Sequence, residues 1–267
     1  MASIINNVSA LNAQRNLATT QSNLNTTINR LSTGLRINRA HDDAAGLAIS
    51  NNLRADVKIL NQARRNANDG LGRLAVQDLV AEEATNLLTR ASELAEQASS
   101  GTTTSAGRVA LNAEFTEIKS ALTALDSDTK FDGVSVFGSQ FDVRVGENAS
   151  ETVSLSSIDI DNTTLGVTGN LLTSGTAGTA LTAITSAIET VSSSRGSIGA
   201  KSARLQTVVN SLGINSENIT AAESQIRDAD IASEVVNLTK FQILSQSGVS
   251  SLAQANQSAQ SVLSLLG

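Results

Sequence analysis

Residues 184–226, ITSAIETVSSSRGSIGAKSARLQTVVNSLGINSENITAAESQI, carry an apolar side chain at every seventh position. This sustained repeat is typical of a helix that packs along other helices. The alternate positions of the repeat are mixed, which favours packing against several neighbours over a free two-stranded coiled coil. The apolar row is Ile184, Val191, Ile198, Leu205, Leu212, Ile219 and Ile226, and the mixed row is Ile188, Arg195, Ser202, Val209, Ser216 and Glu223.

Four further segments repeat apolar residues at spacings of three and four, as one face of a helix does. Each stripe alone fits an ordinary helix, but the chain has no Pro, Trp or Tyr and only five Phe. Together these features predict a mostly α fold, an elongated antiparallel helical bundle or coiled coil with a small β-hairpin region. The stripes are Leu24, Ile28, Leu31 and Leu35; Leu53, Val57, Leu60, Ala67, Leu71, Leu74 and Ala81; Leu111, Phe115, Ile118, Leu122 and Leu125; and Val249, Leu252, Asn256, Ala259, Leu263 and Leu266.

The middle of the chain has a different pattern. Within residues 131–160, apolar and polar residues alternate, which is the period of half-buried strands, and Gly-containing turns separate the runs. We predict one or two β-hairpins there. Residues 161–180 are rich in Gly, Thr and Ser, and we predict a loop that joins the hairpin region to the long helix.

The composition excludes several classes of function. The 267 residues include no Cys, which excludes disulfide scaffolds and Cys nucleophiles, and a net charge of −6 argues against nucleic acid as the main partner. His41-Asp42-Asp43 is the one cluster that resembles a catalytic or metal site. Its carboxylates are better explained as favourable charges at the start of a helix near Ala44. We therefore predict no enzyme: no catalytic residues, no cofactor and no metal.

The two ends predict no membrane insertion. Residues 1–20 have no basic region followed by an apolar run, so we expect no Sec-type signal peptide. No apolar segment has the roughly 18 residues that a membrane-spanning helix needs. Residues 261–267, SVLSLLG, are mostly apolar, which favours their burial against another copy of the chain.

Several motifs, in the same order along the chain, resemble the signatures of bacterial flagellins. The resemblance covers residues 1–160 and 180–267, nearly the whole chain. The matching stretches are NRLSTGLRIN (29–38), HDDAAG (41–46), RNANDG (65–70), FDGV (131–134), ADIASE (229–234), AQAN (253–256) and VLSLL (262–266). The large variable outer domains of many flagellins are missing, so the chain is similar to a minimal flagellin with core domains only.

The resemblance implies an architecture with two parts. Residues 1–44 and 227–267 are expected to form paired N- and C-terminal helices of the inner core. Residues 45–226 are expected to form an outer-core helical bundle with the β-hairpin (131–160) and a surface linker (161–180).

The resemblance also implies a function. The chain is expected to be a structural subunit of the flagellar filament, secreted unfolded through a type III export channel and polymerised into an extracellular helical tube for swimming. Expected partners are other copies of the chain, an export chaperone and the export apparatus, hook-associated junction and cap proteins, and host innate receptors. Two alternatives are a hook–filament junction protein, which shares the terminal patterns, and a cytoplasmic chemoreceptor-type signalling coiled coil, against which the β-like centre counts.

Three groups of site residues follow from the resemblance. Apolar residues near both ends are assigned to inner-core assembly. Residues that match the family's receptor-binding stretch on two neighbouring helices are assigned to innate-receptor contact, and hydroxyl residues of the linker are assigned to O-glycosylation. The groups are Leu24, Ile28, Leu31, Leu35, Val249, Leu252, Leu263, Leu265 and Leu266; Arg90, Leu94 and Glu114; and Thr163, Thr164, Thr168, Thr173, Ser174, Thr176 and Thr179.

Overall fold

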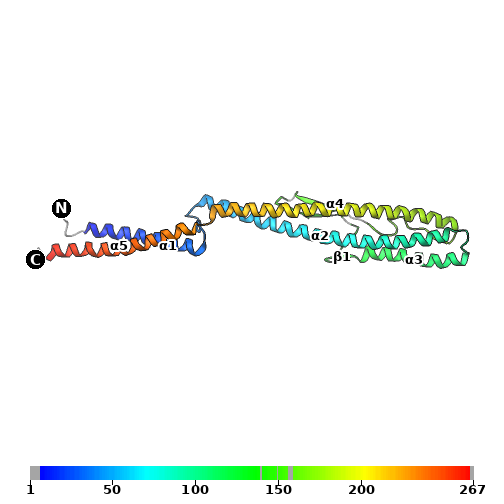
Figure 1. The fold of residues 1–267 in the computed structure, drawn as a ribbon, viewed down its shortest axis with the longest axis horizontal. Coiled ribbons are helices and arrows are strands. Elements are labelled where there is room, and N and C mark those ends of the chain that lie inside the picture. Colours follow the sequence, from blue (N-terminus) through cyan, green and yellow to red (C-terminus); the bar gives the residue numbers. More distant parts are fainter. Residues whose placement is uncertain (1–6, 139, 149, 156–158, 265–267) are drawn as a thin grey trace. The chain divides into compact units, whose positions relative to one another are not determined.

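The computed structural model describes residues 7–138, 140–148, 150–155 and 159–264. Within these residues the chain forms five helices and four short strands (Figure 1). The predicted mostly α fold with a small β region is therefore confirmed. The elements are α1 (Val8–Thr33), α2 (Ala44–Ser99), α3 (Ser105–Asp128), β1 (Lys130–Phe131), β2 (Val134–Ser135), β3 (Phe141–Arg144), β4 (Thr152–Leu155), α4 (Ser174–Arg227) and α5 (Ile231–Ser264).

The chain divides into two compact units, which are described separately. The terminal unit consists of residues 1–55 and 218–267, and the central unit consists of residues 56–217. Helices α2 and α4 contribute residues to both units.

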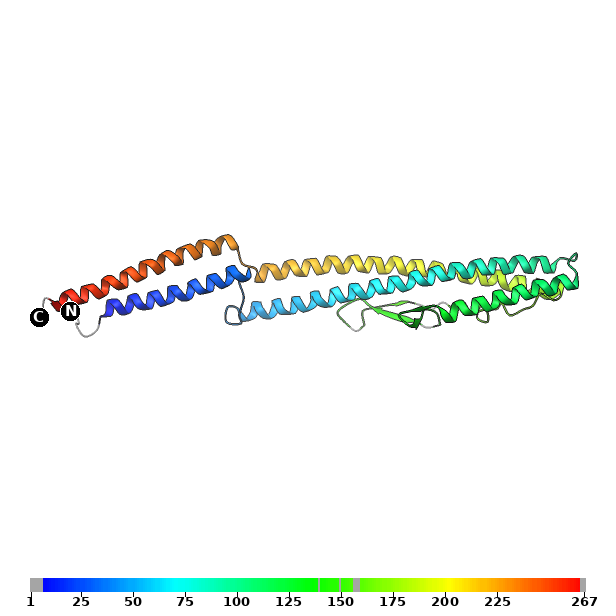
Figure 2. The same cartoon turned by 90° about the horizontal axis from the view of Figure 1, so that it is seen from below.

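In the terminal unit, α1 and α5 pack side by side in antiparallel directions (Figure 2). The side chain of Asn7 caps α1, because its Oδ1 accepts a hydrogen bond from the Ala10 N–H at 3.0 Å. The Nδ2 of the same side chain donates to the Ala255 carbonyl at 2.9 Å and so joins the start of α1 to α5. Further along, Leu17 packs against the backbone of Gly248.

A short backbone ladder closes this unit at the other end of the helix pair. Helix α1 stops at Gly34, which adopts the left-handed conformation (φ +72°) that glycine tolerates best. The Gly34 carbonyl accepts from the Ala229 N–H at 2.9 Å, and the Arg36 N–H donates to the Arg227 carbonyl at 2.7 Å. These bonds tie the segment after α1 to the segment between α4 and α5.

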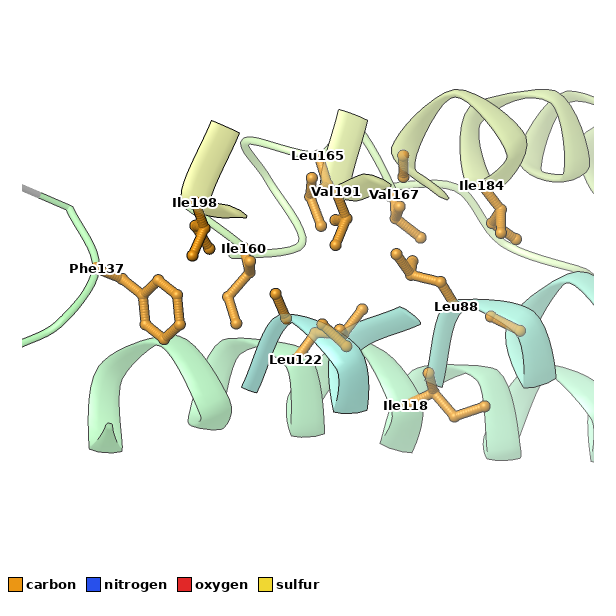
Figure 3. Packing of buried hydrophobic residues seen from close by; sticks show 14 of the residues in the cluster. Leu88, Ile118, Leu122, Phe137, Ile160, Leu165, Val167, Ile184, Val191 and Ile198 are labelled. Carbon is orange, nitrogen blue, oxygen red and sulfur yellow. The ribbon is translucent and has the colours of Figure 1, made fainter. Parts of the chain in front are cut away.

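The central unit is built on α2, α3 and α4, which enclose a continuous hydrophobic core. Figure 3 shows side chains from all three helices and from the segment after the strands pointing toward one another. Five members of the heptad row, Ile184, Val191, Ile198, Leu205 and Leu212, are buried. The mixed-row residue Arg195 instead pairs with two acids of α2: its Nε lies 2.8 Å from Asp78 Oδ1, and its Nη2 lies 3.2 Å from Glu82 Oε2.

The predicted hairpin region contains two antiparallel strand pairs. In β1–β2, Phe131 faces Val134, and in β3–β4, Val143 faces Val153. The first hairpin turns through Asp132 (φ 52°) and Gly133 (φ 77°), both left-handed, as a tight two-residue turn requires. The predicted alternation is seen in the second pair, where Val143, Val153 and Leu155 are buried.

Polar contacts anchor these hairpins on α2. The Gln77 Nε2 donates to the Val136 carbonyl at 2.7 Å, and an Nη atom of Arg73 donates to the Ser135 carbonyl at 2.7 Å. The Arg73 guanidinium also lies 3.8 Å from the centre of the Phe141 ring, a cation–π contact.

Residues 159–173, which we call the strap, correct the predicted linker. The strap buries four apolar side chains, Ile160, Leu165, Val167 and Leu171. Four polar ties hold it to α3. Thr123 donates to Asp161 at 2.9 Å, Lys119 Nζ donates to the Gly169 carbonyl at 3.0 Å, the Leu171 N–H donates to Asn112 at 2.8 Å, and the Ile160 N–H donates to Asp126 at 3.2 Å. Residues 161–173 form a loop without helix or strand, as predicted, but apolar anchors at intervals fix this loop on the bundle.

The loop prediction was wrong about residues 174–180, which form the first turns of α4. Thr173 and Thr176 cap this helix reciprocally. The Thr176 N–H donates to Thr173 Oγ1 at 3.2 Å, and the Thr173 N–H donates to Thr176 Oγ1 at 3.1 Å. Ala177, seven residues before Ile184, is buried and continues the apolar row toward the start of the helix, and Ala180 is buried as well.

Candidate assembly and recognition surfaces

The terminal unit buries almost none of its large apolar side chains completely, and many of them are exposed. Among the side chains described in residues 7–55 and 218–258, Ile37 is the only hydrophobic one that is buried, whereas Thr27, Ser50 and Glu234 are buried polar ones. The exposed apolar side chains of α1 and α5, which we call the α1–α5 apolar surface, are Val8, Leu11, Ile28, Ile231, Val235, Val236, Ile243, Leu244 and Val249. Nine exposed large apolar side chains on one helix pair are unusual for a soluble monomer, so the pair is a candidate for contact with other protein.

The predicted assembly residues lie along this helix pair. Ile28 and Val249 belong to the α1–α5 apolar surface, while Leu24, Leu31, Leu35 and Leu252 are half-buried. Leu263 lies in α5, but its side chain is outside the described side chains. Leu265 and Leu266 lie outside the described residues.

Sequence reasoning missed most of the exposed α5 residues. Val236 and Ile243 are 66% and 69% exposed and belong to neither predicted stripe. Apolar residues occur in α5 more often than a single stripe requires. This excess was the signal in the sequence that could have identified them. An α-helix with apolar side chains on more than one face must bury each of them against something.

The residues assigned to innate-receptor contact divide into two groups. Arg90 of α2 and Glu114 of α3 are exposed and form an ion pair, with Arg90 Nη2 at 2.8 Å from Glu114 Oε1. Arg90 Nη1 also lies 2.9 Å from Glu93 Oε2, and its hydrogen bonds to Glu93 and Glu114 raise the pKa of Arg90. Leu94, in contrast, is 1% exposed and belongs to the core, so its side chain offers no surface to a receptor in this structure.

All seven hydroxyl residues assigned to O-glycosylation are exposed. Thr163, Thr164 and Thr168 lie on the strap, and Thr173, Ser174, Thr176 and Thr179 lie at the start of α4. The α4 hydroxyls make hydrogen bonds; Ser174 Oγ, for example, donates to the Ser99 carbonyl at 2.5 Å. On the strap, Thr163 Oγ1 donates to Asn162 Oδ1 at 3.0 Å.

The His41-Asp42-Asp43 cluster forms the turn before α2. Asp43 caps this helix, because its Oδ1 accepts from the Gly46 N–H at 2.8 Å. Asp42 Oδ2 accepts from the backbone N–H of Arg39 at 2.9 Å and of Asn38 at 3.1 Å, and these bonds, the Arg39 bond first, lower the pKa of Asp42. The carboxylates are thus engaged in backbone capping.

The described residues contain no group of three or more His, Cys, Asp or Glu side chains placed to hold a metal ion. Within the same ranges, none of the helices combines the length and the hydropathy that crossing a membrane requires.

Comparison with known protein families gives two matches, which together cover most of the chain. Residues 4–142 match the bacterial flagellin N-terminal helical region, and residues 181–266 match the bacterial flagellin C-terminal helical region. The strap and the start of α4 lie between the two matched regions.

Whole-length relatives agree with these matches. The chain is 37% identical to a flagellin of Halalkalibacterium halodurans, and the match covers 98% of this chain and 99% of that protein. It is 36% identical, with the same coverage, to the flagellar filament 33 kDa core protein of Treponema phagedenis. A flagellin of Bacillus subtilis is 33% identical, also with 98% and 99% coverage.

Solved structures give the same result for the fold. The crystal structure of Bacillus cereus flagellin superposes with a TM-score of 0.50 at 26% identity, covering 55% of this chain and 88% of that one. The structure of a putative flagellar hook-associated protein from Vibrio parahaemolyticus superposes with a TM-score of 0.57 at 12% identity, covering 70% and 100%, a likeness that shows the fold alone. With both family regions matched and relatives similar over their whole length, the chain belongs to the bacterial flagellin family.

Proposed function

We propose that the chain is a structural subunit of a flagellar filament and that it polymerises through the α1–α5 apolar surface. The exposure of this surface is the observation that supports the proposal. The central unit has a continuous buried core of its own, whereas the terminal unit buries one large apolar side chain among those described. Covering an exposed Val, Leu or Ile contributes about 1.5–3 kcal/mol, so many copies packed together supply the missing stabilisation.

The names of the relatives support the same function. Several are called flagellins or flagellar filament core proteins, and they match this chain from end to end. None of these names favours a junction protein or a chemoreceptor. A filament subunit also needs no catalytic site, consistent with carboxylates at His41-Asp42-Asp43 that cap backbone groups.

A matched pair of variants tests the proposal. Val236→Ser with Ile243→Ser places two hydroxyls on the α1–α5 apolar surface, whereas Leu79→Ser makes the same change at an equally exposed position (69%) of α2 in the central unit. After addition of filament seeds to purified full-length chain, the parent and Leu79→Ser are expected to sediment as filaments seen by negative-stain microscopy. The double variant is expected to stay in the supernatant. Normal filaments from the double variant contradict the proposed surface.

Further parts of the proposal concern how the subunit is exported and assembled. We infer secretion of the unfolded chain through a type III export apparatus, with a chaperone holding it, and assembly outside the cell for swimming together with junction and cap proteins. The apolar side chains of α5 support this inference, since they need a partner before assembly as well as after it. Detection of the chain in the culture medium of an export-defective strain contradicts this route.

Contact with a host innate receptor is proposed for the exposed Arg90–Glu114 pair alone, because Leu94 is buried. Arg side chains are common energetic anchors of protein interfaces. A receptor reporter assay with soluble chain is expected to give a signal that Arg90→Ala reduces. Equal signals from the parent and Arg90→Ala contradict a receptor contact at this pair.

O-linked glycosylation is proposed for the exposed strap residues Thr163, Thr164 and Thr168. The mass of filament subunits from the native host, measured by intact mass spectrometry, is expected to exceed the 27.6 kDa of the chain. A mass equal to that of the chain, with or without Met1, contradicts the proposal.

A further inference from the structure

Helices α1 and α5 carry very few charges. In Val8–Thr33 and Ile231–Ser264 together, the charged side chains are Arg15, Arg30, Glu234 and Lys240. Glu234 is the only acid among them. Most of the remaining side chains are small or aliphatic, or carry a hydroxyl or an amide group. Two helices with such side chains pack with similar energy in several alignments, as helices with a uniform coiled-coil seam do.

The single acid is buried against an Arg of the other helix. Glu234 is 8% exposed, and its Oε1 lies 3.1 Å from Arg30 Nη1. Arg30 lies in the last turn of α1 and Glu234 in the first turn of α5, so both charges also interact favourably with the helix dipoles. Within the described residues, Arg30 Nε and Glu234 Oε2 are buried without a hydrogen-bond partner. The pair is therefore a partly buried ion pair, with the Arg30 side chain 31% and the Glu234 side chain 10% exposed, and it is incompletely satisfied, which makes it a weak source of stability.

The pair belongs to a series of contacts that define one antiparallel alignment. Asn7 bonds to Ala255, Leu17 lies against Gly248, and Arg30 pairs with Glu234. Sliding one helix along the other by a turn, about 5.4 Å, removes Arg30 from the only acid of the two helices and leaves Glu234 without its counterion. The apolar and small side chains impose no comparable penalty on that shift, although the backbone ladder after Gly34 opposes it too.

We propose that Arg30 and Glu234 are positioning residues that fix the register of α1 against α5, and thereby which apolar side chains the helix pair presents for assembly. Buried polar pairs are best attested in this role, in which they select one alignment at some cost in stability. The inference rests on the proposed function in one respect: the register is to be measured in assembled chains.

Engineered disulfides report the register, because the natural chain has no Cys. A Cβ placed on Gly248 stands 3.7 Å from the Leu17 Cβ, within the usual disulfide range. Leu17→Cys with Gly248→Cys therefore reports the native register. Ala13→Cys or Thr20→Cys, each with Gly248→Cys, reports a shift of about one helical turn in either direction. Each pair is built into full-length chain, polymerised, oxidised with copper phenanthroline and quantified by non-reducing electrophoresis.

The deciding comparison introduces the same cysteine pairs into the double variant Arg30→Met with Glu234→Leu, which keeps the side-chain bulk and removes the ion pair. We expect the ratio of native to shifted disulfide to be about ten or more in the parent and to fall about fivefold or more in this variant, since no unpaired charge then opposes the shifted register. Arg15→Met, which removes an exposed charge from the same helix, is the control and is expected to leave the ratio unchanged. An unchanged ratio in the double variant overturns the proposal.

A charge reversal gives a second test if the double variant fails to assemble. Arg30→Glu alone sets two acids against each other, so the ratio is expected to fall. Adding Glu234→Arg restores opposite charges, and the ratio is expected to recover; no recovery overturns the proposal. Failure of the parent chain to sediment as a polymer contradicts the proposed function instead, so the two failures are distinguishable.

Discussion

At the scale of single residues, two glycines in long helices differ in the space that surrounds them for an added side chain. A Cβ added to Gly70 of α2 meets Val143 Cγ2 at 2.8 Å and Leu205 Cδ1 at 3.3 Å, whereas a Cβ added to Gly196 of α4 meets no described atom within 4 Å. Helix propensity alone favours Ala at both positions by about 1 kcal/mol. Packing opposes the change only at Gly70, where β3 and α4 approach α2 closely.

We therefore expect Gly70→Ala to lower the free energy of unfolding by about 1–2 kcal/mol, the net of overpacking and propensity. Gly196→Ala is expected to raise it by about 0.5–1 kcal/mol. Urea unfolding of the full-length chain, followed by circular dichroism, measures both changes. Stabilisation by both substitutions contradicts the close packing at Gly70.

Asp126 gives a pH-dependent prediction. Burial raises the pKa of Asp126, and the nearby Asp159 and Asp161 raise it further, while its hydrogen bond from the Ile160 N–H (3.2 Å) opposes them. A carboxyl whose pKa is higher in the folded state destabilises the fold where it is ionised, and this cost disappears as the pH falls through the folded pKa toward the unfolded value. Asp126→Asn keeps the acceptor and removes the charge.

We expect Asp126→Asn to raise the free energy of unfolding at pH 7 by up to about 1 kcal/mol and to have no effect near pH 3, where both states of the parent are protonated. Thermal unfolding at a series of pH values measures the difference. Asp128→Asn, at an exposed position of the same helix, is the control and is expected to change stability little at either pH. A larger gain at pH 3 than at pH 7 contradicts the sign argued here.

At the scale of elements, the strap provides a matched pair of neighbouring leucines. Leu171 is fully buried, and its N–H is held by Asn112, whereas Leu172 is 48% exposed. Leu171→Ala is expected to lower the free energy of unfolding by about 2–5 kcal/mol, and Leu172→Ala is expected to change it by about 0.5 kcal/mol or less. Equal effects in chemical unfolding contradict the anchored strap and support the loop that the composition predicts.

The elements also show how far the sequence alone leads. The heptad row from Ile184 and the alternation around Val143 and Val153 predict helix and strands correctly, because each pattern reports directly which side chains are buried. The loop at residues 161–173 was predicted, but the burial of the strap's apolar side chains was missed because its Gly, Thr and Ser content outweighed its widely spaced apolar anchors. The start of α4 was missed because Gly175 and Gly178 lower helix propensity, although Thr173 and Thr176 form a recognisable cap.

The candidate sites were less predictable than the fold. Sequence spacing cannot show that Arg195 pairs with Asp78, or Arg30 with Glu234, since these partners are far apart in the chain. Nor can a motif match show exposure: Arg90 and Glu114 are at the surface, while Leu94 is in the core. Long-range pairing and burial depend on tertiary packing, which no local pattern contains.

At the scale of the whole molecule, the two units differ in how they are stabilised. The central unit buries a continuous apolar core within the chain, whereas the terminal unit, among its described side chains, buries one large apolar residue and leaves the others on α1 and α5 exposed or half-buried. A flagellin with this division is expected to keep a folded central unit whether or not it is assembled. The terminal helices, in contrast, should gain most of their stability from neighbouring copies.

This difference predicts the pattern of backbone hydrogen exchange. In soluble chain, amides of α1 and α5 are expected to exchange faster than amides of α3, and on polymerisation protection is expected to rise most in α1 and α5. Hydrogen-exchange mass spectrometry of soluble and assembled chain measures both. Equal protection of all helices in the soluble chain contradicts a terminal unit that depends on assembly.

The most direct test of the central claim is a helical reconstruction of the assembled chain by electron cryo-microscopy. The claim is that the α1–α5 apolar surface is the assembly surface. The reconstruction is predicted to show Val236, Ile243 and Val249, all exposed in the single chain, in contact with side chains of neighbouring copies. A filament in which these side chains face solvent, with subunits joined through the central unit alone, contradicts the claim.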